Sequence, residues 1–342
     1  MTSQVFLWVL CTLAHGGPIA CPSNSACCSE TWDTIEEKDV KYGDADFNGQ
    51  PTQLLMDLYR PCASHPLPVV IYVHGSGFTP LVNKGNEETV RVSRQWAQRG
   101  FLVASIDYRK YGMRDMPRAF THAVQDTLMA IRYLVANCET LGCDPHNIAL
   151  HGCSSGGIVV SHAVIQDFVQ DTPGPGVYGS YPANITVGIS MAGGLIALFP
   201  PNKTAEKIPP YLSVHYREDP SVQYSLSVTT EAVLQELGAT SHELMTLEGN
   251  GHCPPDLLAV AGQWNSNLLN DMAAYLMQHM TLPHCNVEVA TKPECPSTTS
   301  SSSSSTSSST SSSTSNRDQA SMSRSTMSRH FLMLAVSILF VS

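Results

Sequence analysis

Short apolar segments alternate with longer amphipathic segments along most of the chain. The apolar segments are rich in β-branched residues, which is typical of strands buried in a sheet. The predicted strands are residues 40–43, 54–59, 68–73, 101–106, 147–151, 186–191, 211–215 and 243–247. The predicted helices are residues 87–99, 116–137, 156–165, 222–237 and 256–280. Strands that alternate with helices in this way predict an α/β fold with a mainly parallel sheet.

The N-terminal end of the chain does not follow this pattern. Residues 5–14 form an apolar run of the length found in signal peptides, so residues 1–20 are predicted to be a signal peptide. A buried first strand is the alternative. Residues 21–39 follow as a cysteine-rich lead-in, and residues 40–283 are predicted to hold the folded domain.

The C-terminal end also differs from the rest. Residues 297–315 contain only Ser and Thr, and such a segment buries too little apolar surface to offset its ordering entropy. Residues 284–316 are therefore predicted to be a disordered stalk. Residues 317–342 have the small residues, polar spacer and apolar tail of a GPI-attachment signal that is removed. The alternative is a retained membrane-associated tail, although the apolar part is shorter than the roughly 20 residues that span a bilayer.

Charge and cysteine content narrow the possible functions. The formal net charge of −10 argues against nucleic-acid binding, which requires basic patches. Of the eleven cysteines, Cys11 lies in the predicted signal peptide, and the even number that remains suggests disulfides in a secreted chain. Asn184 and Asn202 each begin an N-glycosylation sequon. Together with the two ends, these features predict a glycoprotein that is secreted or held on the extracellular face of the plasma membrane.

A motif of small residues follows the strand predicted at 147–151. The sequence Gly152-Cys-Ser-Ser-Gly156 has the G-x-S-x-G pattern, which places a serine on a sharp turn between a strand and a helix. The turn strains the serine backbone, and the flanking glycines let the strand and helix approach closely. Ser154 is therefore the candidate nucleophile.

A serine hydroxyl needs a base, and the base needs a carboxylate that orients it. These groups are expected on loops at the carboxyl ends of the strands. Asp219 follows the strand at 211–215 and is the predicted acid, with Glu218 as the alternative. His252 lies on a glycine-rich loop after the last strand and is the predicted base, whereas His151 and His215 lie in strands and are interpreted as core residues or residues behind the site.

The segment His74-Gly-Ser-Gly-Phe78 follows a buried strand directly. It resembles the HGGG-type loop that stabilises the oxyanion of an acyl-transfer intermediate, with Ser76 in place of a middle glycine. Backbone N–H groups must already point at the former carbonyl oxygen when negative charge develops on it. The predicted donors are the N–H groups of Ser76, Gly77 and Ser155.

Together these motifs resemble the carboxylesterase branch of the α/β-hydrolase superfamily over residues 40–280. The segments that carry the resemblance are Tyr42-Gly, Leu58-Tyr-Arg-Pro61, His74-Gly-Ser-Gly-Phe78, Ile106-Asp-Tyr-Arg109, Asp144-Pro, Gly152-Cys-Ser-Ser-Gly-Gly157 and Gly251-His252. The resemblance implies an eight-stranded, mostly parallel sheet flanked by helices, and ester hydrolysis without a metal or cofactor. The short segment between residues 191 and 210 leaves no room for a large cap domain.

Cys153 precedes the candidate nucleophile and Cys253 follows the candidate base. A serine within hydrogen-bond reach of the histidine brings these neighbours close enough for a disulfide; thiols that are free or paired elsewhere are the alternative. The arrangement is similar to the CS-D-HC pattern of the tannase and fungal feruloyl-esterase family. Further predicted pairs are Cys138–Cys143 and Cys285–Cys295, with the remaining four cysteines, Cys21, Cys27, Cys28 and Cys62, paired among themselves.

The expected function is therefore a serine esterase that cleaves small-molecule carboxylic esters through an acyl-enzyme on Ser154. An amidase or peptidase with the same triad is one alternative, and a non-catalytic adhesion module on a hydrolase scaffold is another. The expected membrane association is through the GPI anchor, and the sequence leaves the oligomeric state open.

Overall fold

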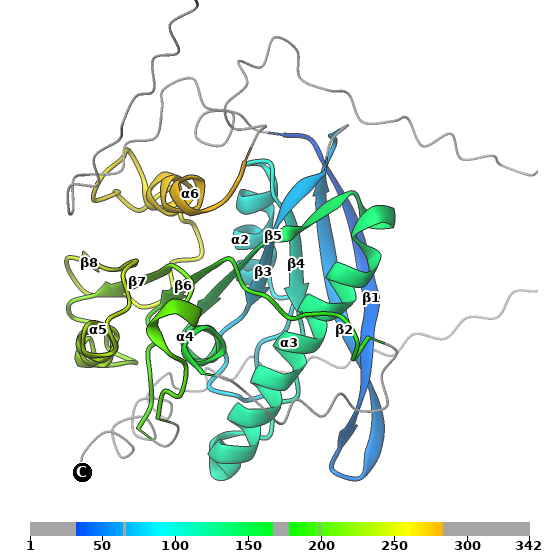
Figure 1. Cartoon of the computed structure of the whole chain (residues 1–342), viewed down its shortest axis with the longest axis horizontal. Coiled ribbons are helices and arrows are strands. Elements are labelled where there is room, and N and C mark those ends of the chain that lie inside the picture. Colours follow the sequence, from blue (N-terminus) through cyan, green and yellow to red (C-terminus); the bar gives the residue numbers. More distant parts are fainter. Residues whose placement is uncertain (1–31, 64–65, 167–177, 198–199, 283–342) are drawn as a thin grey trace, which may run out of the picture.

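The computed structural model describes residues 32–63, 66–166, 178–197 and 200–282. An eight-stranded sheet runs through the described part (Figure 1). Its strands are β1 (Thr34–Phe47), β2 (Gln50–Pro61), β3 (Leu67–Val73), β4 (Leu102–Ile106), β5 (Cys143–Cys153), β6 (Val187–Met191), β7 (Tyr211–Tyr216) and β8 (His242–Leu247). The helices are α2 (Glu87–Ala97), α3 (Met116–Leu141), α4 (Ser155–Ile165), α5 (Ser225–Leu237) and α6 (Leu268–His279), with short 3-10 turns at Met113–Asp115 and Ala205–Lys207.

The strands lie in the order β1-β2-β4-β3-β5-β6-β7-β8. The β1–β2 hairpin is antiparallel and β2 pairs antiparallel with β4, whereas every pair from β4 to β8 is parallel. The prediction of an eight-stranded, mostly parallel sheet is confirmed. Because the parallel strands share one direction, the loops after β3, β4, β5, β7 and β8 all emerge at the same edge.

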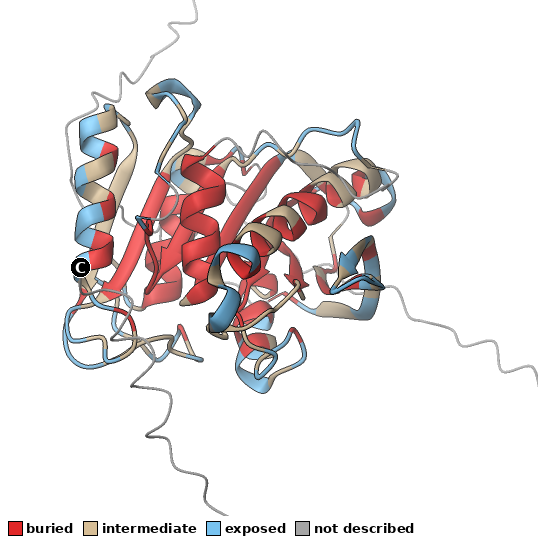
Figure 2. Cartoon of the chain, turned by 90° about the horizontal axis from the view of Figure 1, so that it is seen from below, coloured by how far each residue is buried: buried red, intermediate tan, exposed pale blue. Residues whose placement is uncertain are grey.

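Helices cover both faces of the sheet. One core lies between the sheet and α3, α4 and α5, and the other lies between the sheet and α2 and α6. The central strands β3 and β4 are buried along their whole length, which explains their continuous apolar sequences. In Figure 2 helices are buried toward the sheet and exposed on the outer side, except α4, which is buried along its whole length. No inserted cap domain separates β6 from β7 in the described residues, as predicted.

Two elements differ most from the sequence prediction. The first strand begins at Thr34, earlier than expected, because residues 34–37 pair with the end of β2 despite their polar sequence. The last helix covers only Leu268–His279 and not residues 256–280. The carboxylate of Asp271 accepts the N–H groups of Gln263, Trp264 and Asn265, and these bonds hold the preceding segment as a loop.

The predictions for the two ends of the chain lie outside the described residues. They concern the signal peptide, the stalk, the GPI-attachment signal and the pair Cys285–Cys295. Across the residues that the structure does describe, none of the helices has the length and apolar character of a membrane-spanning segment.

Candidate active site

Ser154 lies on a strained turn between β5 and α4. Its backbone has φ 57° and ψ −125°, a conformation that costs free energy for a residue with a side chain. The flanking glycines make the turn possible: a Cβ on Gly156 would overlap the carbonyl oxygen of Val73, and one on Gly152 would overlap the carbonyl of Gly156. The sharp strand-to-helix turn expected from the G-x-S-x-G motif is therefore present.

His252 and Asp219 form a hydrogen-bonded pair at the same edge of the sheet. Nδ1 of His252 lies 2.7 Å from Oδ2 of Asp219, whose side chain is fully buried, while the His252 side chain is 24% exposed. Oδ1 of Asp219 accepts the N–H groups of Ser221 and Val222 at 2.7 and 2.9 Å. The carboxylate is thus fixed on one side by backbone and offers its other oxygen to the imidazole.

The charge of Asp219 is stabilised by its neighbours. Burial alone raises the pKa of this carboxyl, but hydrogen bonds from His215 and His252 outweigh burial and hold the pKa well below its usual range. Asp219 is therefore ionised at neutral and mildly acidic pH. The alternative acid, Glu218, is exposed, and its backbone N–H bonds to the carbonyl of Gly249 in the loop that carries His252.

A disulfide joins the serine turn to the histidine loop. Cys153 and Cys253 are bonded, with their Cα atoms 6.0 Å apart, so this predicted pair is present. Ser154 follows Cys153 and His252 precedes Cys253, so the bond ties the serine turn to the loop that carries the histidine.

A second predicted disulfide, Cys138–Cys143, is also present, at the end of α3. Cys62 is disulfide-bonded as well, whereas Cys21, Cys27 and Cys28 lie outside the described residues.

Removing the Cys153–Cys253 bond should impair both stability and turnover. The bond closes a loop of 100 residues, so the variant Cys153→Ala/Cys253→Ala should lose about 4–5 kcal/mol of unfolding free energy. The freed loop should misplace His252 and lower kcat by about 100-fold, the cost of a small misalignment of reacting groups. Thermal unfolding and ester turnover measure the two effects.

The matched control is Cys138→Ala/Cys143→Ala, which removes a bond across only five residues. It should leave kcat unchanged. Full kcat in the Cys153→Ala/Cys253→Ala variant would show that the bond is not needed to hold the loop of His252 in place.

The predicted oxyanion loop lies beside the serine turn. Gly77 and Phe78 both have positive φ values of 59°, which curl the loop back on itself. The N–H of Ser76 donates to Oγ of Ser155 at 2.9 Å, so in this structure that donor is engaged. The N–H of Ser155 is in the first turn of α4, where N–H groups have no acceptor within the helix.

A cluster of polar side chains supports this loop from behind, and the sequence analysis assigned it no role. The hydroxyl of Tyr108 donates to the carbonyl of His74 at 2.9 Å and lies 3.2 Å from Oγ of Ser76. Asp107 lies 3.2 Å from Nε2 of His74 and 3.0 Å from Nζ of Lys110. The segment Ile106-Asp-Tyr-Arg109 carried the only signal for this cluster, as part of the family resemblance.

The ionisation of the cluster follows from its contacts. Burial lowers the pKa of His74, although the hydrogen bond to Asp107 raises it in part. Burial raises the pKa of Asp107, but hydrogen bonds and charges from His74 and Lys110 outweigh it and lower that pKa to about 2. An ionised Asp107 thus anchors both side chains behind the loop.

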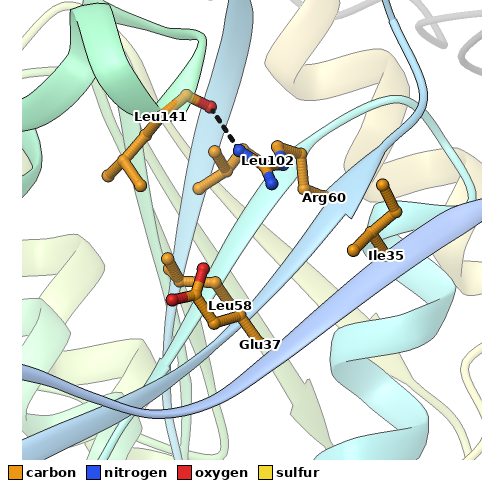
Figure 3. A pocket seen from close by; sticks show the side chains of 6 residues that line it. All are labelled: Ile35, Glu37, Leu58, Arg60, Leu102 and Leu141. Carbon is orange, nitrogen blue, oxygen red and sulfur yellow. Dashed lines mark hydrogen bonds between the residues drawn. The ribbon is translucent and has the colours of Figure 1, made fainter. Parts of the chain in front are cut away.

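A small cavity lies at the opposite edge of the sheet (Figure 3). Its lining includes Leu102, the first residue of β4, and Arg60, which donates to the carbonyl of Leu141 at 3.5 Å. The start of a parallel strand lies away from the carboxyl edge, so this cavity is not part of the candidate site. Within the described ranges, no group of three or more His, Cys, Asp or Glu side chains is placed to hold a metal ion.

The two predicted glycosylation sites, Asn184 and Asn202, are both exposed. They lie in the segments before β6 and before β7, which enter the sheet from the edge opposite Ser154. A glycan on either residue would therefore leave the candidate site open.

Comparisons with known proteins agree with the fold. The family model BD-FAE matches residues 56–172. The chain is 27% identical over 256 residues to a probable isoprenylcysteine alpha-carbonyl methylesterase of Oryza sativa, covering 63% of this chain and 57% of that protein. It is 31% identical over 141 residues to the carboxylesterase NlhH of Mycobacterium tuberculosis, covering 41% of this chain and 40% of that protein. The chain thus spans about half the length of these relatives.

Solved structures show the same architecture. A truncated carbohydrate esterase from gut microbiota matches with a TM-score of 0.53 at 19% identity, over 73% of this chain and 98% of that one. Esterase 2 of Thermogutta terrifontis, phosphoramylated by tabun, matches with a TM-score of 0.54 at 18% identity, over 72% of this chain and 92% of that one. Sheet order and serine turn agree with these structures: the chain has an α/β-hydrolase fold, and its sequence is similar to those of carboxylesterases.

Proposed function

We propose that this protein is a serine hydrolase that cleaves carboxylic esters through an acyl-enzyme on Ser154. The observation that carries the proposal is the buried Asp219–His252 hydrogen bond, tied by the Cys153–Cys253 disulfide to the strained turn of the serine. A base, its orienting carboxylate and a nucleophile on such a turn are the parts that acyl transfer requires.

In the proposed reaction each group has a role in the first half. Nε2 of His252 accepts the hydroxyl proton of Ser154 as Oγ attacks the ester carbonyl, and Nδ1 donates to Asp219 throughout. The carbonyl oxygen becomes an oxyanion, and the backbone N–H groups of Gly77 and Ser155 stabilise it. Engaging the N–H of Ser76 as well would require Oγ of Ser155 to give up its present bond.

The second half reverses these proton transfers. His252 gives its proton to the leaving alcohol oxygen as the C–O bond breaks, and the acyl group stays on Ser154. Water then attacks the acyl carbon, gives its proton to His252, and releases the carboxylic acid as the proton returns to Ser154 Oγ. Each cycle consumes one water and restores the free enzyme.

The substrate class is a small-molecule carboxylic ester. The sequence relatives are named carboxylesterase and methylesterase, which supports an ester over an amide. The experiment compares turnover of nitrophenyl esters of increasing acyl length, phenolic esters and the matching anilides. Ester turnover should exceed anilide turnover for every acyl group; faster anilide turnover would favour an amidase or peptidase.

We further propose that the protein acts on the cell exterior, attached by a GPI anchor added near residues 315–321. The disulfides, the exposed sequons at Asn184 and Asn202, and the order of segments in residues 317–342 support this location. A phospholipase C that cleaves GPI anchors should release the activity from intact cells, and activity that stays with the cells would contradict the anchor.

A further inference from the structure

The carboxylate of Asp219 lies between two imidazole rings. Its Oδ2 is 2.7 Å from Nδ1 of His252 and 3.4 Å from Nε2 of His215. His215 lies in β7, four residues before Asp219, and the side chains of both are fully buried. Of the two histidines, only His252 is exposed to solvent and to a substrate.

Hydrogen bonds fix the proton on one nitrogen of His215. Nε2 lies 3.0 Å from the carbonyl oxygen of Val222, which can only accept, so Nε2 carries a proton. The same nitrogen lies 3.4 Å from Oδ2 of Asp219, a longer contact than the one to Val222. His215 is therefore a donor on the side that faces the carboxylate.

The other side of the His215 ring contacts a chain of buried serines. Nδ1 lies 2.7 Å from Oγ of Ser227, which also lies 2.9 Å from Oγ of Ser213 and 2.9 Å from the carbonyl oxygen of Gly193. Ser227 has one proton, so it donates either to Gly193 or to His215. In both arrangements Nε2 remains the nitrogen that donates to Val222.

Building on the proposed function, we infer that His215 is a positioning residue for the reaction. Its Nε2–H holds Oδ2 of Asp219 in the orientation that meets His252. It also spreads the negative charge of the carboxylate, so that Asp219 attracts the proton on His252 less strongly. His215 acts through Asp219 and does not touch the substrate.

The electrostatics of the site agree with this role. The hydrogen bond from His215 is the largest of the effects that lower the pKa of Asp219 against its burial, followed by that from His252. Among the described residues, Tyr224 is the only one whose titratable ring contacts the ring of His215. The two ring centroids are 5.7 Å apart. The guanidinium of Arg217 lies 5.4 Å from the centroid of the Tyr224 ring, and it forms an exposed ion pair with Glu248.

The test compares two variants of His215 by their pH profiles. His215→Phe keeps the ring volume but removes the donor, and His215→Gln keeps an N–H at a similar reach. His215→Phe should lower kcat by about 10- to 100-fold with little change in KM, because a misplaced base slows the chemical step. Its acidic limb of kcat/KM should move to higher pH, because Asp219 without the second donor holds the His252 proton more tightly. His215→Gln should restore both values toward wild type.

A matched control separates this role from simple packing. His151 is equally buried and bonds to Nε1 of Trp96 on the other face of the sheet, so His151→Phe removes a buried histidine without contact to Asp219. It should keep the wild-type pH profile. All variants are compared by thermal unfolding, so that a loss of folded protein is not counted as a loss of kcat.

Two results would overturn the inference. One is a folded His215→Phe variant with wild-type kcat and an unmoved acidic limb. The other is an equal loss of kcat in His215→Phe and His215→Gln with no movement of the limb, which is what a purely structural residue would show. Failure of the wild-type protein to hydrolyse any ester would instead refute the proposed function.

Discussion

Replacing Asp219 with Asn should lower kcat for ester hydrolysis by about 10⁴-fold. The amide has a similar shape but no charge, so it neither fixes the Nδ1–H tautomer of His252 nor stabilises the imidazolium that forms during attack. The 2.7 Å contact between Nδ1 and Oδ2 and the complete burial of the carboxylate make this loss specific, because water cannot replace the missing charge.

The neighbouring carboxylate supplies the matched control. Glu218 is exposed, whereas the Asp219 side chain is fully buried, so Glu218→Gln should keep nearly full activity. Steady-state turnover of a nitrophenyl ester, measured with active-site concentration known, compares the two variants. A larger loss in Glu218→Gln than in Asp219→Asn would show that Glu218, and not Asp219, is the acid.

Replacing Ser154 with Ala should have a still larger effect, about 10⁶-fold on kcat. Removal of the hydroxyl takes away the oxygen that we propose is acylated, while the strained turn and its flanking glycines remain. The adjacent Ser155 cannot replace it, because its Oγ is buried and bonded to the N–H of Ser76. Ser155→Ala should therefore retain the capacity to form an acyl-enzyme, and the contrast between these serines is the control. Equal turnover by Ser154→Ala and the wild type would place the nucleophile elsewhere.

The parallel sheet and the serine turn could be predicted because local sequence determines them. Continuous apolar runs such as residues 68–73 have no solvent face, and this is a property of strands buried on both sides. The residues around Ser154 must be small because backbone atoms a few residues away or on the adjacent strand leave no space for a side chain. The motif alone therefore predicts the turn.

The boundaries that differed depend on contacts distant in sequence. The polar start of β1 is a strand because it pairs with the end of β2, with a register shift between Glu37 and Val40. The segment before α6 has apolar residues at helical spacing, but the buried carboxylate of Asp271 captures three of its N–H groups. Neither effect is visible in a local pattern.

The residues of the candidate site could be predicted from the sequence, but the residues that hold them in place could not. Asp219 and His252 follow strands that share one edge, so their approach follows from topology. The choice between Glu218 and Asp219 depends on how the turn after Tyr216 is bonded to the loop at Gly249, which the sequence does not show. The link from His215 to Asp219 and the cluster around Asp107 likewise depend on side-chain directions that only the folded chain defines.

The central claim is that Ser154 is a nucleophile activated by the Asp219–His252 pair. The most direct measurement is peptide mapping by mass spectrometry after the folded protein reacts with a fluorophosphonate. The account predicts one adduct per chain, on Ser154, with slow labelling in Asp219→Asn and none in Ser154→Ala. An unlabelled folded protein, or equal labelling of Ser154→Ala, would contradict it.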